Sequence, residues 1–534
     1  MKTTIKNLIL SAVLVVGGAS CVDLDTAPYD RETDLTYWEE DPEAAVKALN
    51  TCYTYLGNMD EQLYCEAMTD NAYTKQPNDA TQNIGNGSYS TADPYVKKVW
   101  DGRYTGIRMC NELLENIDRV PDLDPELKKR YIGEAKVLRA YNYYELYTKF
   151  GDVPYTTKVL SIKESMSIAR TAKATVIANV LADLDEVING NYLPTSYDAD
   201  NKGRITRWAA MAIKAKIYLF EGNWTQVKNI TSTIMTEGGF KLFGSYAGLF
   251  EIANEYNSEV ILDAQYRPTS REHQMMYAFL PPSLGGYSQL SPLQELVDSY
   301  IMLDGKTIRE TGTSFDESNP YANRDPRLKA TVMYTGNSYT LADGTEVVIN
   351  CEKGEGKDGY GVGSDCSATG YYIKKYWDNT YRATLYSGLN PILIRYADIL
   401  LMNAEALAEL GELDKTAWDA TIKPIRDRAG FTLASAVEFP EGASKDKLIG
   451  IVRNERRSEL ALEGHRHKDI IRWRIADDVL NGWCHGLKTN EVVGTDNGYV
   501  RVENRAFNAN KHYLWPIPQA ERDLNGNLVQ NPNW

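Results

Sequence analysis

The stretch from Asn390 to Gly411 constrains the fold of this chain most strongly. Asn390 and Pro391 block a helix just upstream, and Gly411 suits a left-handed cap at the downstream end. Between them, apolar residues recur every three or four positions, the spacing of a helix with one buried face. These residues are Ile394, Ala397, Leu400, Leu401, Ala404, Leu407 and Ala408. Three of them are alanines, so a neighbouring helix can pack closely against this face.

A second helical stretch, from about Asp414 to Arg428, follows after a short turn, although Pro424 should break or kink it. Two helices joined in this way form a hairpin, and several other stretches have the same pattern. The hairpin at 208–220 and 224–235 also resembles a tetratricopeptide repeat. The remaining predicted helices begin at Asp41-Pro42-Glu43, cover 100–120, begin at Asp124-Pro125 and end at Gly151, and cover 173–188.

The chain changes character from about 240 to 390. Short strands are predicted at 260–266, 330–334, 346–350 and 371–377, separated by glycine and asparagine turns. Helical spacing returns at 392 and continues to about 483, and the last fifty residues are expected to be mostly loop. We therefore predict a mainly α fold, in which tetratricopeptide-like helical hairpins (about 41–240 and 390–483) pack against an irregular, loop-rich insertion (about 240–390).

The N-terminus has the pattern of an export signal. Lys2 and Lys6 precede an apolar run at 8–16, which is too short to span a bilayer. Small residues at 17–20 then lead to Cys21, an order typical of a bacterial lipoprotein signal. We expect a signal peptide at 1–20, a lipidated acidic tether at 21–40 with the lipid on Cys21, and a single domain at 41–534; ordinary secretion with a chance cysteine is the alternative.

Composition narrows the classes of partner. The formal charge is −15, whereas nucleic-acid binders neutralise phosphates with clustered Lys and Arg. Tyrosine is abundant, with 36 Tyr beside 10 Trp and 10 Phe. A tyrosine ring is a flat apolar surface with a polar tip, which suits both helix packing and ligands that carry hydroxyl groups. Composition does not choose between these two uses.

Motifs for cofactor or metal chemistry are weak. Gly354-x-Gly356-x-x-Gly359 matches a dinucleotide fingerprint formally, but the residues after it cannot form the helix that must receive the pyrophosphate, so we predict a flexible loop. His465 and His467 have no nearby Cys or carboxylate that completes a metal set, and a surface or helix-end position is expected. We therefore predict no cofactor and no metal.

The charged run near residue 455 favours structure over chemistry. Glu455, Glu459 and Glu463 share one helical face among several arginines, which predicts a salt-bridged structural helix. Six cysteines remain after Cys21, and an exported protein could pair them in disulfides, although buried free thiols are at least as good an expectation for most of them. Cys351 with Cys366 is the one pair worth testing for a disulfide that closes a loop.

No catalytic motif is present: there is no nucleophile elbow, zinc-protease motif or phosphate loop. Residues 74–94 form a long loop rich in Asn, Gln, Gly and Ser, and such loops often carry function. Tyrosines gather around this loop and in the irregular segment, where sugar rings could stack on them, although a single tyrosine more often packs locally. Binding is therefore favoured over catalysis. A surface-anchored glycan hydrolase and a helical-repeat protein-interaction adaptor remain alternatives.

The chain resembles the SusD-like (RagB-type) outer-membrane nutrient-binding lipoproteins of Bacteroidetes over nearly its whole length. The resemblance begins with the lipoprotein start at Cys21 and its acidic tail. It continues through EAKVLRAYNYYELYTKFGDVPY (134–155), RWAAMAIKAKIYLFEGNW (207–224), SPLQELVDSYIMLDGK (291–306), RDPRL (324–328), NPILIRYADILLMNAEALAELGEL (390–413), ERRSELALEGHRHKDIIRW (455–473) and YLWPIPQAERDLNGNLVQNPNW (513–534). His467 stands where an aromatic residue is commoner in the family, and Pro424 is unusual.

This resemblance implies four tetratricopeptide-like helical pairs packed against a variable half. It also implies a lipoprotein of the outer-membrane surface that captures an oligosaccharide or another nutrient, pairs with a SusC-like TonB-dependent transporter, and is not an enzyme. Family ligand sites tend to lie in the loop after the first helix and in the irregular central segment. We therefore expect ligand contacts at Tyr73, Asn83, Tyr89, Tyr266, Tyr287 (just before SPLQEL) and Trp377.

Overall fold

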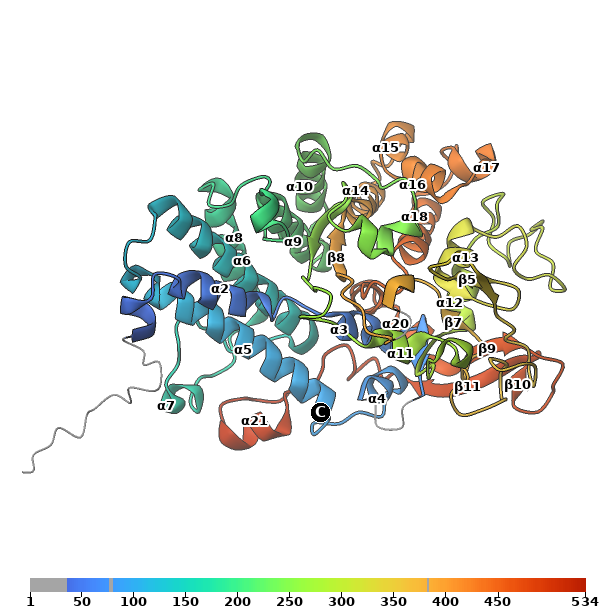
Figure 1. The fold of residues 1–534 in the computed structure, drawn as a ribbon, viewed down its shortest axis with the longest axis horizontal. Helices are drawn as coiled ribbons and strands as arrows, with labels where there is room; N and C mark the ends of the chain where they lie inside the picture. The colour runs from blue at the N-terminus through green and yellow to red at the C-terminus, as the bar shows by residue number, and fades with distance from the viewer. Residues whose placement is uncertain (1–35, 76–79, 382–383) are drawn as a thin grey trace, which may run out of the picture.

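The computed structural model describes residues 36–534 except 76–79 and 382–383 (Figure 1). The predicted signal peptide at 1–20, Cys21 and most of the tether lie outside the described residues. The end of the predicted tether needs correction. Thr36–Glu40 forms a short helical turn, η1, and Trp38 is buried in the helical core. The fold therefore begins before residue 41, because an indole inside an acidic stretch still contributes a large apolar surface.

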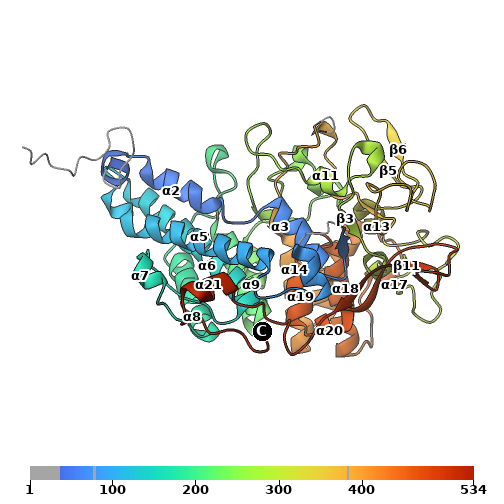
Figure 2. The same ribbon diagram turned by 90° about the horizontal axis from the view of Figure 1, so that it is seen from below.

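Long helices lie side by side in a row that forms the helical half of the molecule (Figures 1 and 2). Each helix packs against the next one along the row. In order, they are α2 (Ala44–Tyr53), α5 (Pro94–Asn116), α6 (Pro125–Phe150), α8 (Lys173–Asn189), α9 (Arg207–Phe220), α10 (Trp224–Glu237), α14 (Tyr396–Leu410) and α18 (Lys445–Glu459). The mainly α architecture of hairpins is confirmed. Helices α10 and α14 pack against each other although the long insertion separates them in the sequence.

Local signals explain where these helices begin and end. Asp124 accepts a hydrogen bond from the Leu127 amide and Pro125 occupies the first turn of α6, as predicted. Gly151 ends this helix with φ at 72°. The turn between α9 and α10 contains Gly222 with φ at 70°, and Asn223 caps α10 by accepting from the Gln226 amide.

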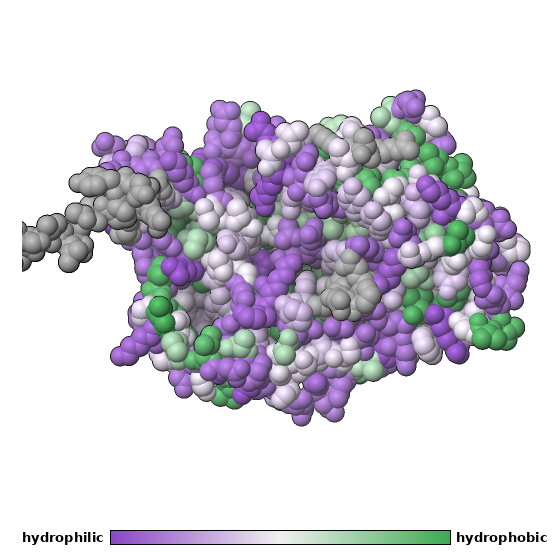
Figure 3. Space-filling model, turned by 60° about the horizontal axis from the view of Figure 1, so that its bottom comes forward, coloured by the Kyte–Doolittle hydropathy of each residue, from purple (hydrophilic) through white to green (hydrophobic). Residues whose placement is uncertain are grey.

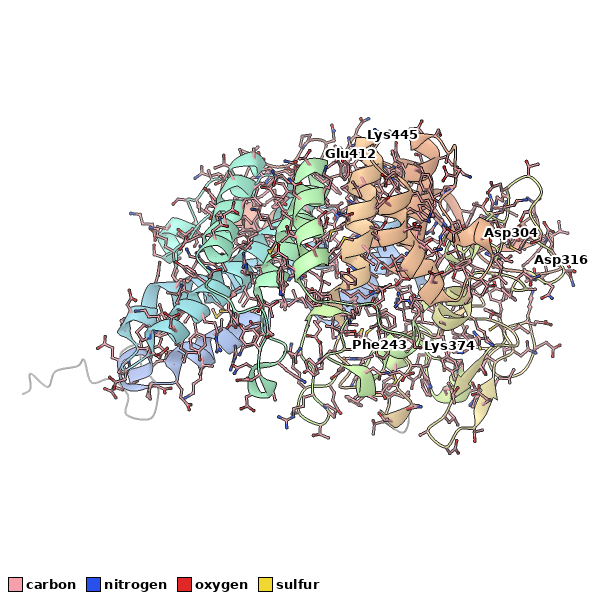
Figure 4. The ribbon with its side chains drawn as sticks, turned by 90° about the horizontal axis from the view of Figure 1, so that it is seen from above. Phe243, Asp304, Asp316, Lys374, Glu412 and Lys445 are labelled. Atoms are coloured by element: carbon pink, nitrogen blue, oxygen red, sulfur yellow. The ribbon has the colours of Figure 1, made fainter. Side chains whose placement is uncertain are left out.

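The central stretch at 390–411 is partly a strand. Residues Ile392–Arg395 form β8, and α14 begins only at Tyr396. The helical periodicity of the sequence concealed this strand, because a short apolar run fits both a strand and a buried helix end. Gly411 closes α14 in the left-handed conformation, with φ at 74°. Figure 4 shows Glu412, just after this cap, at the same edge of the molecule as Lys445, where α18 begins.

Pro424 has the expected effect on the second helix of this hairpin. The helix is divided at Thr421 into α15 (Lys415–Ala420) and α16 (Ile422–Ala429). Pro424 lies in the first turn of α16, where its missing N–H leaves no helical hydrogen bond unmade. Gly430 then ends α16 in the left-handed conformation.

Short strand pairs build much of the other half of the molecule, and every pair is antiparallel. Strand β2 pairs with β8, and this ladder joins the insertion to the start of α14. The strands are β1 (Ala72–Thr74) with β3 (Leu290–Pro292), β2 (Val260–Asp263) with β8, β4 (Val332–Met333) with β7 (Tyr372–Ile373), and β5 (Ser338–Thr340) with β6 (Glu346–Val348). Strands were predicted near β2, β4, β6 and β7, whereas β1, β3 and β5 were not.

Short helices complete the described chain. The predicted loop at 74–94 contains one of them, α4, so that loop is shorter than expected. These helices are α3 (Met59–Tyr64), α4 (Ala80–Asn86), α7 (Ile162–Ser165), α11 (Met275–Phe279), α12 (Gln294–Ser299), α13 (Pro326–Thr331), α17 (Ala434–Val437), α19 (Arg466–Arg472), α20 (Ala476–Val479) and α21 (Gln519–Leu524). Short 3-10 turns also occur, among them η7 (Pro282–Leu284) and η8 (Asn379–Tyr381).

The last fifty residues are mostly turn and loop, as predicted, but they also take part in a strand ribbon that was not predicted. Strands β9 (Asn481–Lys488) and β11 (Tyr499–Ala506) form a long antiparallel ribbon with β10 (Thr495–Asp496) on the edge. The ribbon is seen at the lower right of Figure 1. Strand β9 contains two glycines and no β-branched residue, so its sequence lacks the usual strand signal.

The charged run around Glu455 forms a buried ion-pair cluster between the two halves. Glu455 pairs with Arg327 and Arg426, Glu459 with Arg327, Arg395 and Arg428, and Glu463 with Arg395 and Lys375. The predicted salt-bridged structural role is confirmed. Two details differ: the cluster is buried rather than solvated, and Glu463 lies just beyond α18.

The glycine motif at 354–359 and the two histidines at 465 and 467 are part of the structure of the fold rather than of a cofactor or metal site. The predicted loop at Gly354, Gly356 and Gly359 is confirmed, since these residues lie in successive turns. His465 precedes α19 and His467 lies in its first turn, and burial lowers the pKa of each imidazole to about 3. Among the described residues, no group of three or more His, Cys, Asp or Glu side chains is arranged to hold a metal ion.

All six cysteines of the described region are free thiols, so the proposed Cys351–Cys366 disulfide does not form. Both residues are buried in the loop-rich half, and the Cys366 thiol contacts the carbonyl oxygen of Lys357 at 3.4 Å.

The surface is mixed, and apolar side chains gather at its two ends in Figure 3. At one end lie α7 and α21, with the exposed Ile162 in α7, Met166 just after it and Leu524 in α21. At the other end, Val492 and Val493 are exposed in the turn after β9. None of the helices in the described part of the chain has the length and apolar character needed to cross a membrane.

Candidate ligand-binding site

A cavity of about 900 Å³ opens on the loop-rich half of the molecule. The loop from α11 through η7 forms one wall, the turn between β5 and β6 forms a second, and the start of η8 with Leu385 forms a third. Its lining residues are Tyr277, Pro282, Ser283, Leu284, Gly285, Tyr287, Leu341, Ala342, Asp343, Lys357, Asn379, Thr380 and Leu385. A volume of this size fits a ligand of a few sugar rings.

Tyr277 and Tyr287 form a stacked aromatic pair in this cavity. Their ring centroids are 5.8 Å apart and the ring planes differ by 23°. The Tyr287 amide donates a hydrogen bond to the Tyr277 carbonyl oxygen at 2.8 Å, which fixes the two backbones side by side. Tyr287 is 47% exposed, unusually high for so large a ring. The pair therefore presents a flat aromatic face to solvent.

The chain between the two tyrosines is a tight loop that depends on glycine. Gly285 has φ at 87°, which favours glycine strongly. A Cβ on Gly286 would lie 2.1 Å from the Leu280 carbonyl oxygen, so no larger residue fits. Buried Asp358 accepts a hydrogen bond from the Ser283 amide at 2.7 Å and ties the loop to the neighbouring segment. The position of Tyr287 thus follows from the local sequence.

Polar groups surround the aromatic face. Lys357, Asn379 and Thr380 line the cavity; Lys357 and Thr380 are exposed, and Asn379 is half-buried. The Ser283 hydroxyl is buried in the wall without a hydrogen-bond partner among the described residues. An amide, an ammonium and hydroxyl groups beside an aromatic face are the groups that bind a sugar, because the ring stacks while the hydroxyls receive hydrogen bonds.

The three predicted residues of the first region lie outside this cavity. Tyr73 is in β1 opposite Ser291 of β3, and its hydroxyl accepts a hydrogen bond from the Gln82 side chain at 3.3 Å. Asn83 is in the middle of α4, and its carbonyl oxygen accepts a hydrogen bond from the Ser88 amide beyond the end of the helix. Tyr89 is 4% exposed and packs on Trp534, with centroids 4.8 Å apart, so it occupies a core position.

Of the three residues predicted in the second region, one lines the cavity and two do not. Tyr287 lines the cavity. Trp377 donates its indole N–H to the carbonyl oxygen of Thr340, the last residue of β5, at 2.8 Å and does not line the cavity. Tyr266 packs edge-on against His273, with the Arg271 guanidinium 4.9 Å from its ring, and does not line the cavity.

Tyr277 is the aromatic residue of this cavity that the prediction from sequence omits. It was one of several tyrosines in the irregular segment, and nothing in its immediate neighbours distinguishes it. The signal that could have identified it is the segment Pro281-Pro282-Ser283-Leu284-Gly285-Gly286 before Tyr287. A proline pair and a glycine pair so close together indicate a loop that turns back, which brings its flanking residues together.

Comparisons with known proteins agree with this architecture. The profile of the SusD family matches residues 249–534, and a second profile, described as starch-binding associating with outer membrane, matches residues 37–219. The SusD-like protein P25 of Formosa agariphila is 27% identical, over 99% of this chain and 98% of that protein. The SusD-like protein P2 of the same organism is 26% identical, over 86% of this chain and 83% of that protein.

Solved structures show the same fold. A SusD-like carbohydrate binding protein from Bacteroides fragilis has a TM-score of 0.81 and 29% identity, and the match covers 92% of this chain and 100% of that one. A laminarin binding SusD-like protein has a TM-score of 0.68 at 24% identity over 92% and 99% of the two chains, which shows the fold alone. With one profile matching more than half of its length, this chain belongs to the SusD family.

Proposed function

We propose that this protein binds an oligosaccharide at the surface of the outer membrane and passes it to a SusC-like TonB-dependent transporter. The observation that carries the proposal is the stacked Tyr277–Tyr287 pair, whose exposed face lies in a cavity large enough for several sugar rings. The solved relative from Bacteroides fragilis, described as a carbohydrate binding protein, supports the same class of ligand.

The proposed site includes one of the six ligand contacts expected from the sequence. Tyr287 is retained, and Tyr277, Asn379 and Lys357 are added because they line the same cavity. Tyr73, Asn83, Tyr266 and Trp377 remain proposals for contacts with a longer ligand that extends beyond the cavity. Tyr89 is the weakest of the expected contacts because its ring is buried.

Binding is proposed rather than catalysis. Hydrolysis of a glycosidic bond uses a pair of carboxyl groups about 5 to 9.5 Å apart. Of the described residues that line the cavity, Asp343 is the single carboxylate. The aromatic face and its polar rim are sufficient for capture of a sugar without this second acid.

A lipid on Cys21 would hold the protein at the membrane, since the residues before Cys21 have the order of a lipoprotein signal. The family description that associates starch binding with the outer membrane supports this location. The transporter partner follows from the family resemblance, and copurification from cells that carry a tag on this chain tests it directly.

The first test is a binding screen by affinity electrophoresis with the full-length protein in mild detergent, against host and plant polysaccharides. We expect one polysaccharide to retard the protein without release of reducing ends. Release of reducing ends would contradict the binding role. Absence of retardation by every polysaccharide would contradict an oligosaccharide ligand and leave another nutrient as the cargo.

A further inference from the structure

A second cavity, of about 830 Å³, lies in the helical half of the molecule. Its walls come from the end of α6, the segment before α8, the end of α19 and the C-terminal residues 513–532. We call it the carboxy-terminal cavity. It shares no lining residue with the Tyr277–Tyr287 cavity. The two sites can therefore be tested separately.

The carboxy-terminal cavity is basic, although the protein as a whole carries a formal charge of −15. Arg170, Lys173, Arg472 and Arg474 line it, against the single carboxylate of Asp152. Two of these cations are neutralised nearby. Lys173 pairs with Glu221 at 2.9 Å, and Arg472 pairs with Glu405 at 2.6 Å.

Arg170 and Arg474 have no carboxylate oxygen within 4.0 Å in the described part of the chain. Arg170 donates its hydrogen bonds to neutral acceptors, namely the Asp152 and Val529 carbonyl oxygens at 2.7 and 2.6 Å and the Asn531 side chain at 2.6 Å. The guanidinium is therefore held in place, and its charge is only partly offset, by the Asp152 carboxylate more than 4.0 Å away. Partial burial lowers the pKa of Arg170, because it disfavours the charged guanidinium.

Arg474 is the accessible cation of the pair. Its side chain is exposed. The residue lies two positions after the end of α19, and its backbone is in the left-handed conformation, with φ at 57°. Its guanidinium carbon lies 3.8 Å from the centroid of the Tyr513 ring. The Tyr513 hydroxyl donates to Asp477 at 2.5 Å, so the ring is fixed. A guanidinium stacked on a ring keeps the N–H groups at its edge available to an anion.

The rest of the wall suits an organic ligand rather than a bare ion. Phe220 and Leu514 contribute apolar surface, and Asn527 and Gln530 contribute amides. Tyr147, fully buried, forms part of the wall, and its hydroxyl has no hydrogen-bond partner among the described residues. Aromatic and amide groups beside an unpaired guanidinium match a sugar that carries a negative charge.

We propose that the carboxy-terminal cavity binds a hexuronate, with the sugar carboxylate hydrogen-bonded to Arg474 and its charge offset by Arg170. The sugar ring occupies the space beside Phe220 and the amides. This site is separate from the oligosaccharide site proposed above and does not depend on it.

The test is a calorimetric titration of the full-length protein in detergent with glucuronate, with glucose as the neutral analogue and sulfate as the inorganic anion. We expect glucuronate to bind with a Kd of about 1 mM or tighter, and glucose and sulfate to bind at least about tenfold more weakly. Arg474→Gln should weaken glucuronate binding by about tenfold or more, because it removes the charged donor.

The matched control is Arg309→Gln, which removes an exposed arginine that pairs with Asp298 elsewhere on the loop-rich half. Glucuronate affinity should be unchanged in this variant and in Tyr287→Ala. Equal affinities for glucuronate in Arg474→Gln and Arg309→Gln would overturn the proposal, as would the absence of glucuronate binding. Sulfate binding as tight as that of glucuronate would also overturn it, since the site would then hold an inorganic anion only.

Discussion

Arg395 and Glu463 form a two-point ion pair in the interior of the protein. The Arg395 Nε donates to one Glu463 carboxylate oxygen at 2.8 Å and Nη2 donates to the other at 2.7 Å, and both side chains are 1% exposed. The same guanidinium contacts Glu259 at 2.7 Å and Glu459 at 2.6 Å. Arg395 is the last residue of β8, so a single side chain connects the start of α14 to two distant segments, one just before β2 and one at the end of α18.

Replacing Arg395 with methionine should be strongly destabilising. The change keeps much of the side-chain volume but leaves the Glu463 carboxylate with one cation and removes a partner from Glu259 and Glu459. Removing one member of a buried ion pair typically costs about 3–5 kcal/mol of unfolding free energy. Urea denaturation followed by circular dichroism measures the loss.

The control for this variant is Arg309→Met, because Arg309 and Asp298 form an ion pair at 3.0 Å in which the arginine is 83% exposed. An exposed pair contributes roughly 0–1 kcal/mol, so this variant should unfold like the wild type. Equal effects of the two substitutions would show that the buried cluster is not a source of stability.

Gly411 and Gly450 offer a matched pair of glycine substitutions. Gly411 closes α14 with φ at 74°, so Gly411→Ala should lower the unfolding free energy by about 1 kcal/mol, because a Cβ is disfavoured in that conformation. Gly450 lies inside α18, exposed, with no atom within 4 Å of an added Cβ. Gly450→Ala should raise stability by about 0.5–1 kcal/mol. Thermal denaturation with the same sign for both variants would contradict this reasoning.

The helices that could be predicted from sequence are those whose ends carry local signals. Asp124, Pro125 and Gly151 define α6 through contacts within a few residues of each end. The ion-pair role of Glu455 and Glu459 was also predictable from their spacing. Their burial was not, because it depends on Arg327 and Arg395, which lie far away in the sequence.

The site was less predictable because its parts meet through long-range packing. Tyr89 belongs to a polar loop in the sequence, yet it is covered by Trp534, the last residue of the chain. Tyr277 belongs to the site because the backbone turns between it and Tyr287, and no periodic pattern records that turn. The β9–β11 ribbon was missed for a similar reason: its strands are stabilised by pairing with each other rather than by an apolar alternation in β9.

The attachment of this ribbon should depend on pH through His485 of β9. When the ring is protonated, its Nδ1 donates to a carboxylate oxygen of Glu295 in α12 at 2.8 Å and its Nε2 donates to one of Asp496 in β10 at 3.0 Å. The hydrogen bond with Glu295, followed by the one with Asp496, raises the pKa of His485 above its ordinary 6.5. A raised histidine pKa gives stability that is complete below 6.5 and is lost as the pH rises through the folded value.

Hydrogen exchange of the β9 amides should therefore show weaker protection at pH 8.5 than at pH 6, after correction for the intrinsic pH dependence of exchange. His485→Gln removes the titrating group and should remove this difference. Amides of α6, which has no histidine, provide the internal reference. A pH-dependent change in α6 equal to that in β9 would indicate a global effect rather than the local contact of His485.

Tyr287→Ala tests the proposed ligand site. The ring is 47% exposed and stacks on Tyr277, so its removal leaves the core intact and should change the Tm little. Loss of an aromatic stacking contact should weaken binding of the polysaccharide that retards the protein by roughly 0.5–1.5 kcal/mol, beyond the loss of buried area.

Tyr256→Ala is the control, because this tyrosine is 41% exposed and does not line the cavity. Calorimetry that shows wild-type affinity for Tyr287→Ala would place the ligand elsewhere on the molecule. Weakened binding in Tyr287→Ala alone would assign the stacked pair to the ligand, because the two variants differ in position and not in chemistry.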